Sequence, residues 1–133
     1  MTGKDEIDGS HRAVLIDQLA TRDLGESQPE IYDRPIGLRL LYQDPRSGAE
    51  HYLVRYPAGL RARRHRHSAA HTIVVIEGVL QADGQLLRAG SYAHFPAETP
   101  MRHEPAPDQD CLFVILFDGP FDVYPVGEAK GMQ

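Results

Sequence analysis

The 133-residue sequence lacks the features that mark several large classes of protein. It holds one cysteine, Cys111, which excludes an intramolecular disulfide framework and fits a reducing compartment. No stretch approaches the roughly 20 apolar residues of a membrane span, and Met1–His11 lacks the apolar core of a signal peptide. The sequence therefore predicts a cytoplasmic protein without a membrane partner.

The net charge of the chain argues against nucleic acid as a partner. The formal net charge is −5, whereas binding to phosphate backbones needs a basic face of lysine and arginine. We expect no nucleic-acid partner. A chain of this length matches one domain and buries about two-thirds of its unfolded surface on folding, which is enough for a real core.

Short strands separated by frequent turns predict an all-β fold. Gly37–Gln43 and Glu50–Tyr56 indicate a hairpin, because Asp-Pro-Arg-Ser-Gly lies between them. The apolar run Cys111–Phe117 is typical of a strand buried on both faces. Three further short strands are expected in the middle of the chain, at Gly78–Ala82, Gln85–Arg88 and Ser91–Phe95.

The remaining segments are less regular. Residues 1–12 are expected to form a disordered leader, and residues 13–133 a single domain. Ala13–Leu19 fits either a first strand or a short helix, while Thr21–Arg34 is polar and predicts irregular structure. Pro96–Asp110 holds four prolines and indicates a loop at the rim of the fold.

Three histidines, at positions 65, 67 and 71, lie within seven residues. Side chains on a strand alternate faces, so His65 and His67 project to the same side, where both rings can reach one ion. The short Ser68–Ala70 segment allows a bend, after which His71 opens an apolar strand. Imidazole ligands suit Zn, Cu, Fe and Ni, so the pattern predicts a site for a divalent transition metal.

This segment resembles the first motif of the cupin superfamily, G-x5-H-x-H-x3/4-E-x6-G. Gly59, His65, His67 and Gly78 occupy its fixed positions, and His71 stands where the family usually has glutamate. The resemblance extends over residues 37–126 and implies a cupin-type double-stranded β-helix, which is a jelly-roll barrel. Among cupins the chain is most similar to small stand-alone barrels and to the cupin domain of anti-sigma-factor-type proteins.

The second cupin motif, G-x5-P-x-G-x2-H, has a looser counterpart that begins at Gly90 and passes through Pro96. Glu98 replaces the motif's glycine, Met101 takes the position of its histidine, and His103 follows two residues later. The resemblance therefore implies a ligand set of His65, His67, His71 and His103, with Met101 as the alternative to His103. The metal is left open among Fe, Zn, Ni, Cu and Mn.

Four neutral ligands would leave a divalent ion with its full charge, which favours a small anionic substrate. Candidates for contact with that substrate are Arg63, as a carboxylate clamp, and Tyr92, His94 and Met101. The sequence identifies no catalytic acid or base, because Glu77 and Glu98 are the only acids near the motifs and both are expected at exposed positions.

Two functions remain open. The first is a metal-dependent enzyme of the dioxygenase or isomerase type, acting on a small molecule. The second is a non-catalytic module that senses a small molecule, a metal or redox state. About 35 residues precede the barrel, too few for the helical domain of an anti-sigma factor, which favours the stand-alone form. Exposed sheet edges further predict a homodimer.

Overall fold

A computed structural model describes residues 14–19 and 23–127, and these residues form eleven strands and no helix. The strands are β1 (Gly25–Ser27), β2 (Ile36–Gln43), β3 (Glu50–Tyr56), β4 (His65–His67), β5 (His71–Glu77), β6 (Val79–Ala82), β7 (Gln85–Arg88), β8 (Tyr92–Phe95), β9 (His103–Pro105), β10 (Cys111–Phe117) and β11 (Val123–Pro125). All the pairings between these strands are antiparallel.

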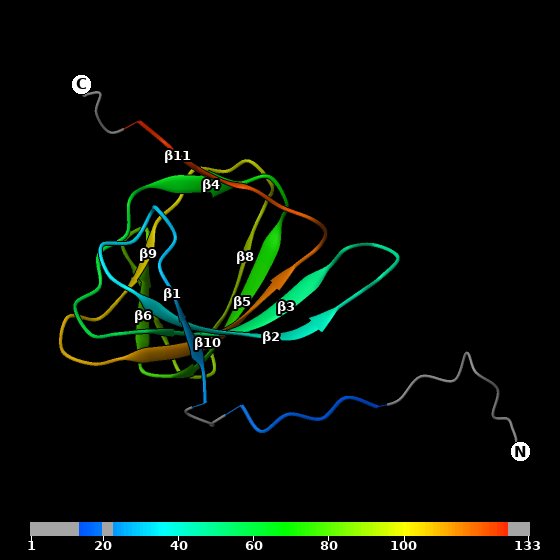
Figure 1. Cartoon of the computed structure of the whole chain (residues 1–133). Coiled ribbons are helices and arrows are strands. Elements are labelled where there is room, and N and C mark those ends of the chain that lie inside the picture. The colour runs from blue at the N-terminus through cyan, green and yellow to red at the C-terminus, as the bar shows by residue number, and fades with distance from the viewer. Residues whose placement is uncertain (1–13, 20–22, 128–133) are drawn as a thin grey trace, which may run out of the picture.

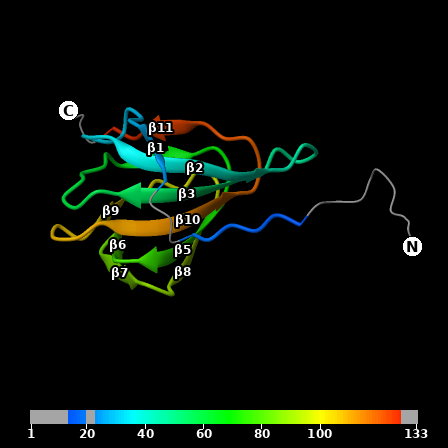
Figure 2. The same ribbon diagram turned by 60° about the horizontal axis from the view of Figure 1, so that its bottom comes forward.

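The strands form two layers that close into a jelly-roll barrel. One layer is a six-stranded sheet in the order β1-β2-β3-β10-β5-β8, whose central strands lie side by side in Figure 2. The other consists of the β11-β4 and β7-β6-β9 sheets, and a bridge between His65 and Met101 links the two. Figure 1 looks along the barrel, with β4 and β11 opposite β2, β3 and β10.

Strand β10 separates two apolar clusters. Phe113, Ile115 and Phe117 face the barrel interior, where they join a core that includes Tyr56 and Ile73. On the outer side of the same sheet, Leu53, Leu112 and Val114 form a second cluster, against which Leu19 and Leu24 pack. Successive strand residues point to opposite faces, so a continuous apolar run is required where both faces are covered. The expectation of a doubly buried strand at Cys111–Phe117 is confirmed.

The hairpin expected at residues 37–56 is present as β2 and β3, paired from Gly37–Arg55 to Gln43–Glu50. Two segments expected to be irregular carry short strands: β1 lies within Thr21–Arg34, and β9 lies within Pro96–Asp110. Both strands are only three residues long, which is too short for a periodic signal.

The expectation for Ala13–Leu19 is not met. Its described part, residues 14–19, forms neither strand nor helix and runs along the outside of the barrel (Figure 1). Asp17 ties this segment to β2, because its carboxylate accepts a hydrogen bond from Arg39 at 2.6 Å. The expected leader, residues 1–12, lies outside the described residues. No helix in residues 14–19 or 23–127 is long and apolar enough to cross a membrane.

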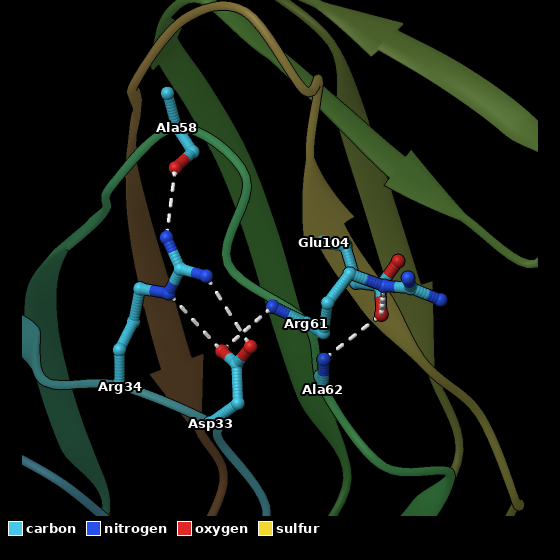
Figure 3. Close-up of polar contacts among 6 residues, drawn as sticks. All are labelled: Asp33, Arg34, Ala58, Arg61, Ala62 and Glu104. Atoms are coloured by element: carbon cyan, nitrogen blue, oxygen red, sulfur yellow. Dashed lines mark hydrogen bonds and ion pairs between the residues drawn. The ribbon is translucent and has the colours of Figure 1, made fainter.

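The segment before β2 is fixed to the barrel by a network of polar contacts shown in Figure 3. The Asp33 carboxylate accepts a hydrogen bond from the Arg61 amide at 2.9 Å, and the Asp33 amide donates to the Arg61 carbonyl at 3.1 Å. The Glu104 carboxylate accepts from the Ala62 amide at 2.8 Å. Tyr32 itself pairs with Ala62 in an isolated bridge. Residues 31–33 are therefore held to the barrel wall beside β9.

Two glycines with positive φ provide a test of the packing between β5 and β10. Gly78 has a φ of 81°, and an added Cβ would collide with the Asp110 carbonyl oxygen. Gly84 has a φ of 88°, but a Cβ there would meet nothing within 4 Å. We expect Gly84→Ala to lower the free energy of unfolding by about 1–2 kcal/mol, which is the backbone cost alone.

Gly78→Ala should cost at least about 2 kcal/mol more, because the steric conflict adds to the same backbone penalty. Urea unfolding of both variants at one pH measures the difference. Equal losses would show that the β5–β6 turn moves away from Asp110 without cost.

Candidate metal centre

Four histidines meet inside the barrel. His65 and His67 come from β4, His71 opens β5 and His103 opens β9. Their exposed fractions are 0%, 6%, 1% and 1%, and they are the buried polar or charged side chains of the described residues. The alternation expected for β4 is present, since the intervening Arg66 points outward to pair with Glu98 at 2.7 Å.

The four imidazoles form a closed circuit of ring contacts. Ring centres are 4.9 Å apart for His65 and His67, 4.4 Å for His67 and His71, 6.1 Å for His71 and His103, and 5.7 Å for His103 and His65. Aromatic side chains surround the group: Phe95 stacks on His71 at 4.8 Å, and Phe117 lies 5.2 Å from both His67 and His71. The histidines thus share one apolar compartment.

Five ring nitrogens of this cluster are buried and have no hydrogen-bond partner in the structure: His65 Nε2, His67 Nδ1, His71 Nδ1 and Nε2, and His103 Nε2. Two rings are oriented by their other nitrogen. His65 Nδ1 lies 2.7 Å from the Arg63 carbonyl oxygen, to which it donates, and His103 Nδ1 lies 2.8 Å from the Tyr56 hydroxyl. Such contacts from one nitrogen typically orient the other toward a metal.

The separations between the four rings bear on whether they can share an ion. In residues 14–19 and 23–127, no three histidine, cysteine or acidic side chains are arranged to hold a metal as they stand. Imidazoles bound about 2.0–2.1 Å from one ion have ring centres about 4.5–6.5 Å apart. The observed separations of 4.4–6.1 Å fall close to that range, so the four rings are near enough to one another to contact one ion.

Burial keeps these imidazoles neutral. It lowers the pKa of His67 to about 3, with further lowering by His71 and His65. Burial, followed by His65 and His94, lowers the pKa of His71 to about 4, while the Ala69 backbone acts weakly in the opposite direction. The pKa of His103 is well below its usual value for the same first reason, burial. Only the neutral form of histidine binds a metal, and these rings are in that form at neutral pH.

A cavity of about 150 Å³ adjoins the cluster. Apolar and aromatic side chains form nearly all of its wall, and no lysine, arginine, aspartate or glutamate is among the described residues that line it. The lining residues are Pro29, Ile31, Tyr32, Ile36, Leu38, Tyr52, Val54, Tyr56, His67, His103, Phe113, Ile115, Phe117, Phe121 and Val123.

Three tyrosines line this cavity, and they differ in where their hydroxyls point. The Tyr56 hydroxyl lies 2.8 Å from His103 Nδ1 and 2.6 Å from the Tyr32 hydroxyl, whereas the Tyr52 hydroxyl donates to the Glu50 carboxylate at 2.7 Å. Burial raises the pKa of Tyr32 to about 12 and raises the pKa of Tyr56 well above its usual value, so both hydroxyls keep their protons. Sequence reasoning missed Tyr32 and Tyr56. The inward face of β3 could have indicated Tyr56, but no local pattern marks Tyr32.

The candidate substrate contacts lie elsewhere. The Arg63 side chain is half exposed and pairs with Glu30 at 3.8 Å, Tyr92 is 69% exposed, and His94 is exposed beside the Thr72 hydroxyl at 3.0 Å. None of the three is among the described residues that line the cavity. Met101 is 1% exposed and bridges to His65, while His103 supplies the ring that contacts the other histidines.

The sequence model of the ChrR cupin-like domain family matches residues 29–122, which is well over half of the chain. The chain belongs to the ChrR cupin-like domain family. This agrees with the resemblance found in the sequence motifs. None of the curated proteins compared with the chain is a significant match in sequence.

Solved structures show the same fold. The chain is similar to an acetylacetone dioxygenase from Acinetobacter johnsonii, with a TM-score of 0.72 and 18% identity over 93% of this chain and 85% of that one. It is also similar to the polyketide cyclase RemF from Streptomyces resistomycificus, with a TM-score of 0.68 and 17% identity over 86% of this chain and 87% of that one. A third similar chain is in the structure of Rhodobacter sphaeroides SigE with the anti-sigma factor ChrR. Its TM-score is 0.61, with 16% identity over 73% of this chain and 51% of that one. At such identities the likeness extends to the fold alone.

The buried histidines predict that the metal-free cupin-like domain loses stability in acid. Unfolded histidines bind protons near pH 6.5, whereas His67 and His71 resist protonation down to about pH 3 and 4. The unfolded state therefore binds more protons as the pH falls from 6.5 to 4. We expect the free energy of unfolding to fall in this window, by up to about 1.4 kcal/mol per pH unit for each such histidine.

Urea unfolding of chelator-treated protein at pH 7.5, 6, 5 and 4 measures this slope. His67→Gln should make it shallower by about the contribution of one histidine. His51→Gln, on β3 beside Tyr42 and outside the cluster, serves as the matched control and should leave the slope unchanged. A stability that stays constant from pH 6.5 to 4 would contradict the assignment of buried neutral imidazoles.

Proposed function

We propose that this cupin-like domain holds one divalent transition metal through His65, His67, His71 and His103 and acts on a small molecule in the adjoining cavity. The reaction class that best fits is that of a metal-dependent dioxygenase or isomerase. The observation that carries the proposal is the set of buried imidazole nitrogens without partners, placed beside a cavity of about 150 Å³. Buried polar atoms are costly unless something binds them.

The donor set favours Fe, Zn, Ni or Cu over Mg and Ca, because every candidate ligand is an imidazole nitrogen. A bound ion would supply Lewis acidity and coordination positions for substrate oxygen atoms. The chain contributes the remaining features: Phe95 and Phe117 exclude water from the cluster, and the Arg63 carbonyl and Tyr56 hydroxyl fix two rings. No carboxylate is among the described residues that line the cavity, so the polar groups that the chain supplies there are tyrosine hydroxyls and imidazoles.

A second function is supported by the family itself. The matching family takes its description from ChrR, and a structural neighbour is an anti-sigma factor solved with its sigma factor. A non-catalytic module that senses a small molecule, a metal or redox state would use the same histidines and cavity. Turnover distinguishes the two: an enzyme consumes a cavity ligand, in the presence of oxygen for a dioxygenase, whereas a sensor binds the ligand and releases it unchanged.

The metal assignment is tested by measuring metal content. We expect wild-type protein, purified without a histidine tag and reconstituted with Zn²⁺, to bind about one ion per chain. His67→Ala and His103→Ala should weaken Zn²⁺ binding by more than about 100-fold, because loss of a ligand exceeds the 10–100-fold effect of changes around it. Inductively coupled plasma mass spectrometry and competition with a chelating dye provide the two measurements.

His94→Ala is the matched control, since His94 is exposed and bonded to Thr72 outside the cluster. It should retain wild-type metal content. Equal zinc affinity in His67→Ala and wild type would refute the site. The barrel is expected to remain folded in His67→Ala and His103→Ala, because its core comes from residues such as Ile73 and Phe113.

The proposal includes assembly as a homodimer. Exposed apolar side chains on the described surface support it, among them Val14, Leu15 and Ile16, which are 83%, 63% and 84% exposed. Light scattering at high micromolar concentration should give twice the chain mass of 14.8 kDa. Ile16→Asp should shift the equilibrium toward the monomer, whereas a single-chain mass for wild type at that concentration would contradict the dimer.

A further inference from the structure

We propose that Tyr32 binds the cavity ligand: its hydroxyl donates a hydrogen bond to an oxygen acceptor on a small, mainly apolar molecule when a metal occupies the histidine cluster. The inference rests on the proposed metal site and goes beyond it, because it assigns a residue outside both cupin-like motifs and names a ligand class. The evidence is a hydrogen-bonded chain from His103 through Tyr56 to Tyr32.

Counting protons along this chain fixes its direction. A neutral imidazole carries one ring proton, so if Nε2 of His103 binds a metal, its Nδ1 must carry the proton and donate it to the Tyr56 oxygen at 2.8 Å. The Tyr56 hydroxyl then has its single proton free to donate to Tyr32 at 2.6 Å. Tyr32 accepts that bond, and its own proton is left for a third partner.

Without a metal the direction is not fixed in this way. His103 can place its proton on Nε2, so that Nδ1 accepts from Tyr56 and the Tyr56 oxygen accepts from Tyr32. The Tyr32 proton is then used within the chain, and its oxygen faces the cavity as an acceptor. Metal at one end of the chain therefore determines whether Tyr32 donates to a ligand at the other end.

Residues adjacent to both ends of the hydrogen-bonded chain are fixed by polar contacts; Figure 3 shows those of Asp33 and Glu104. Tyr32 bridges to Ala62, and the adjacent Asp33 is fixed to Arg61 by two hydrogen bonds. The Ala62 amide donates to the carboxylate of Glu104, which follows His103 in β9. Strands β3 and β9 therefore carry Tyr56 and His103, and the bridge to Ala62 holds Tyr32 next to them in the wall of the cavity.

The wall restricts the ligand. A cavity of about 150 Å³ holds a molecule of roughly benzene size. The described lining residues are apolar or aromatic apart from the tyrosine hydroxyls and imidazoles, and the Tyr52 hydroxyl is occupied by Glu50. A highly charged ligand would be left without compensating groups. The class of ligand that fits is a small apolar ketone, or its enolate, whose oxygen accepts a hydrogen bond from the Tyr32 hydroxyl.

The test compares a ketone with a hydrocarbon of the same shape. Zinc-loaded wild type, Tyr32→Phe and Tyr52→Phe are titrated with cyclopentanone and with methylenecyclopentane, and dissociation constants are taken from backbone NMR shifts. The measured quantity is the ratio of the two constants, which removes effects common to both probes. Tyr52→Phe is the matched control, because it also removes a wall hydroxyl, one that bonds to Glu50.

We expect Tyr32→Phe to reduce the relative preference for cyclopentanone by about five- to tenfold, the effect of one lost hydrogen bond, and to leave zinc content unchanged. Tyr52→Phe should keep the wild-type ratio. An unchanged ratio in Tyr32→Phe, or an equal change in both variants, overturns the role of Tyr32 while leaving the metal site intact. Failure of wild type to bind zinc overturns the proposed function and this inference together.

A second measurement on wild type does not depend on any variant. In zinc-loaded protein, proton–nitrogen spectra of the imidazole rings should show a slowly exchanging proton on His103 Nδ1. Its absence with zinc bound would mean that the chain runs the other way, and the Tyr32 assignment would fall.

Discussion

The main energetic constraint on this structure is the burial of four imidazoles in one compartment, with five of their ring nitrogens unpaired. Each buried polar atom without a partner costs about 1–3 kcal/mol, and five such nitrogens lie within this one cluster. The apolar barrel offsets that cost, through an interior cluster around Phe113 and an outer cluster around Leu112. A metal ion bound to these nitrogens would remove the cost of leaving them unpaired, which is the physical basis of the proposed metal site.

The departures from the second cupin motif are explained by local structure. Glu98, in place of glycine, adopts a φ of 66°. Its amide donates a hydrogen bond to the His67 carbonyl at 2.8 Å, and its carboxylate forms an ion pair with Arg66. Met101 lies directly opposite His65, so it shares the inward face without contributing a ring. His103 is two residues further along, on the same face of an extended segment. The ring that is displaced in sequence therefore remains at the cluster in space.

The chemistry of the cavity differs from the expectation based on charge. An anionic substrate clamped by Arg63 was a natural inference from four neutral ligands, but the guanidinium lies near Glu30 and outside the wall. The groups that do face the cavity are hydroxyls and imidazoles in an apolar surrounding. In the proposed function, whether enzyme or sensor, such a site would recognise an oxygen atom by a directed hydrogen bond and the remainder of the ligand by its shape.

Local pattern determined much of this protein. Alternation along His65–His67 placed both rings inward, the continuous apolar run at Cys111–Phe117 identified a strand covered on both faces, and turn residues identified the hairpin of β2 and β3. Strands β1 and β9 have three residues each, as β4 does, but lack the paired histidines that marked β4, so they were not recognisable. Only the tertiary structure brought Tyr32, 24 residues before Tyr56 and far from both motifs, into the hydrogen-bonded chain that ends at His103. The reason is physical: alternation fixes the face on which a side chain lies, whereas contact across the barrel is set by how distant strands pair and close.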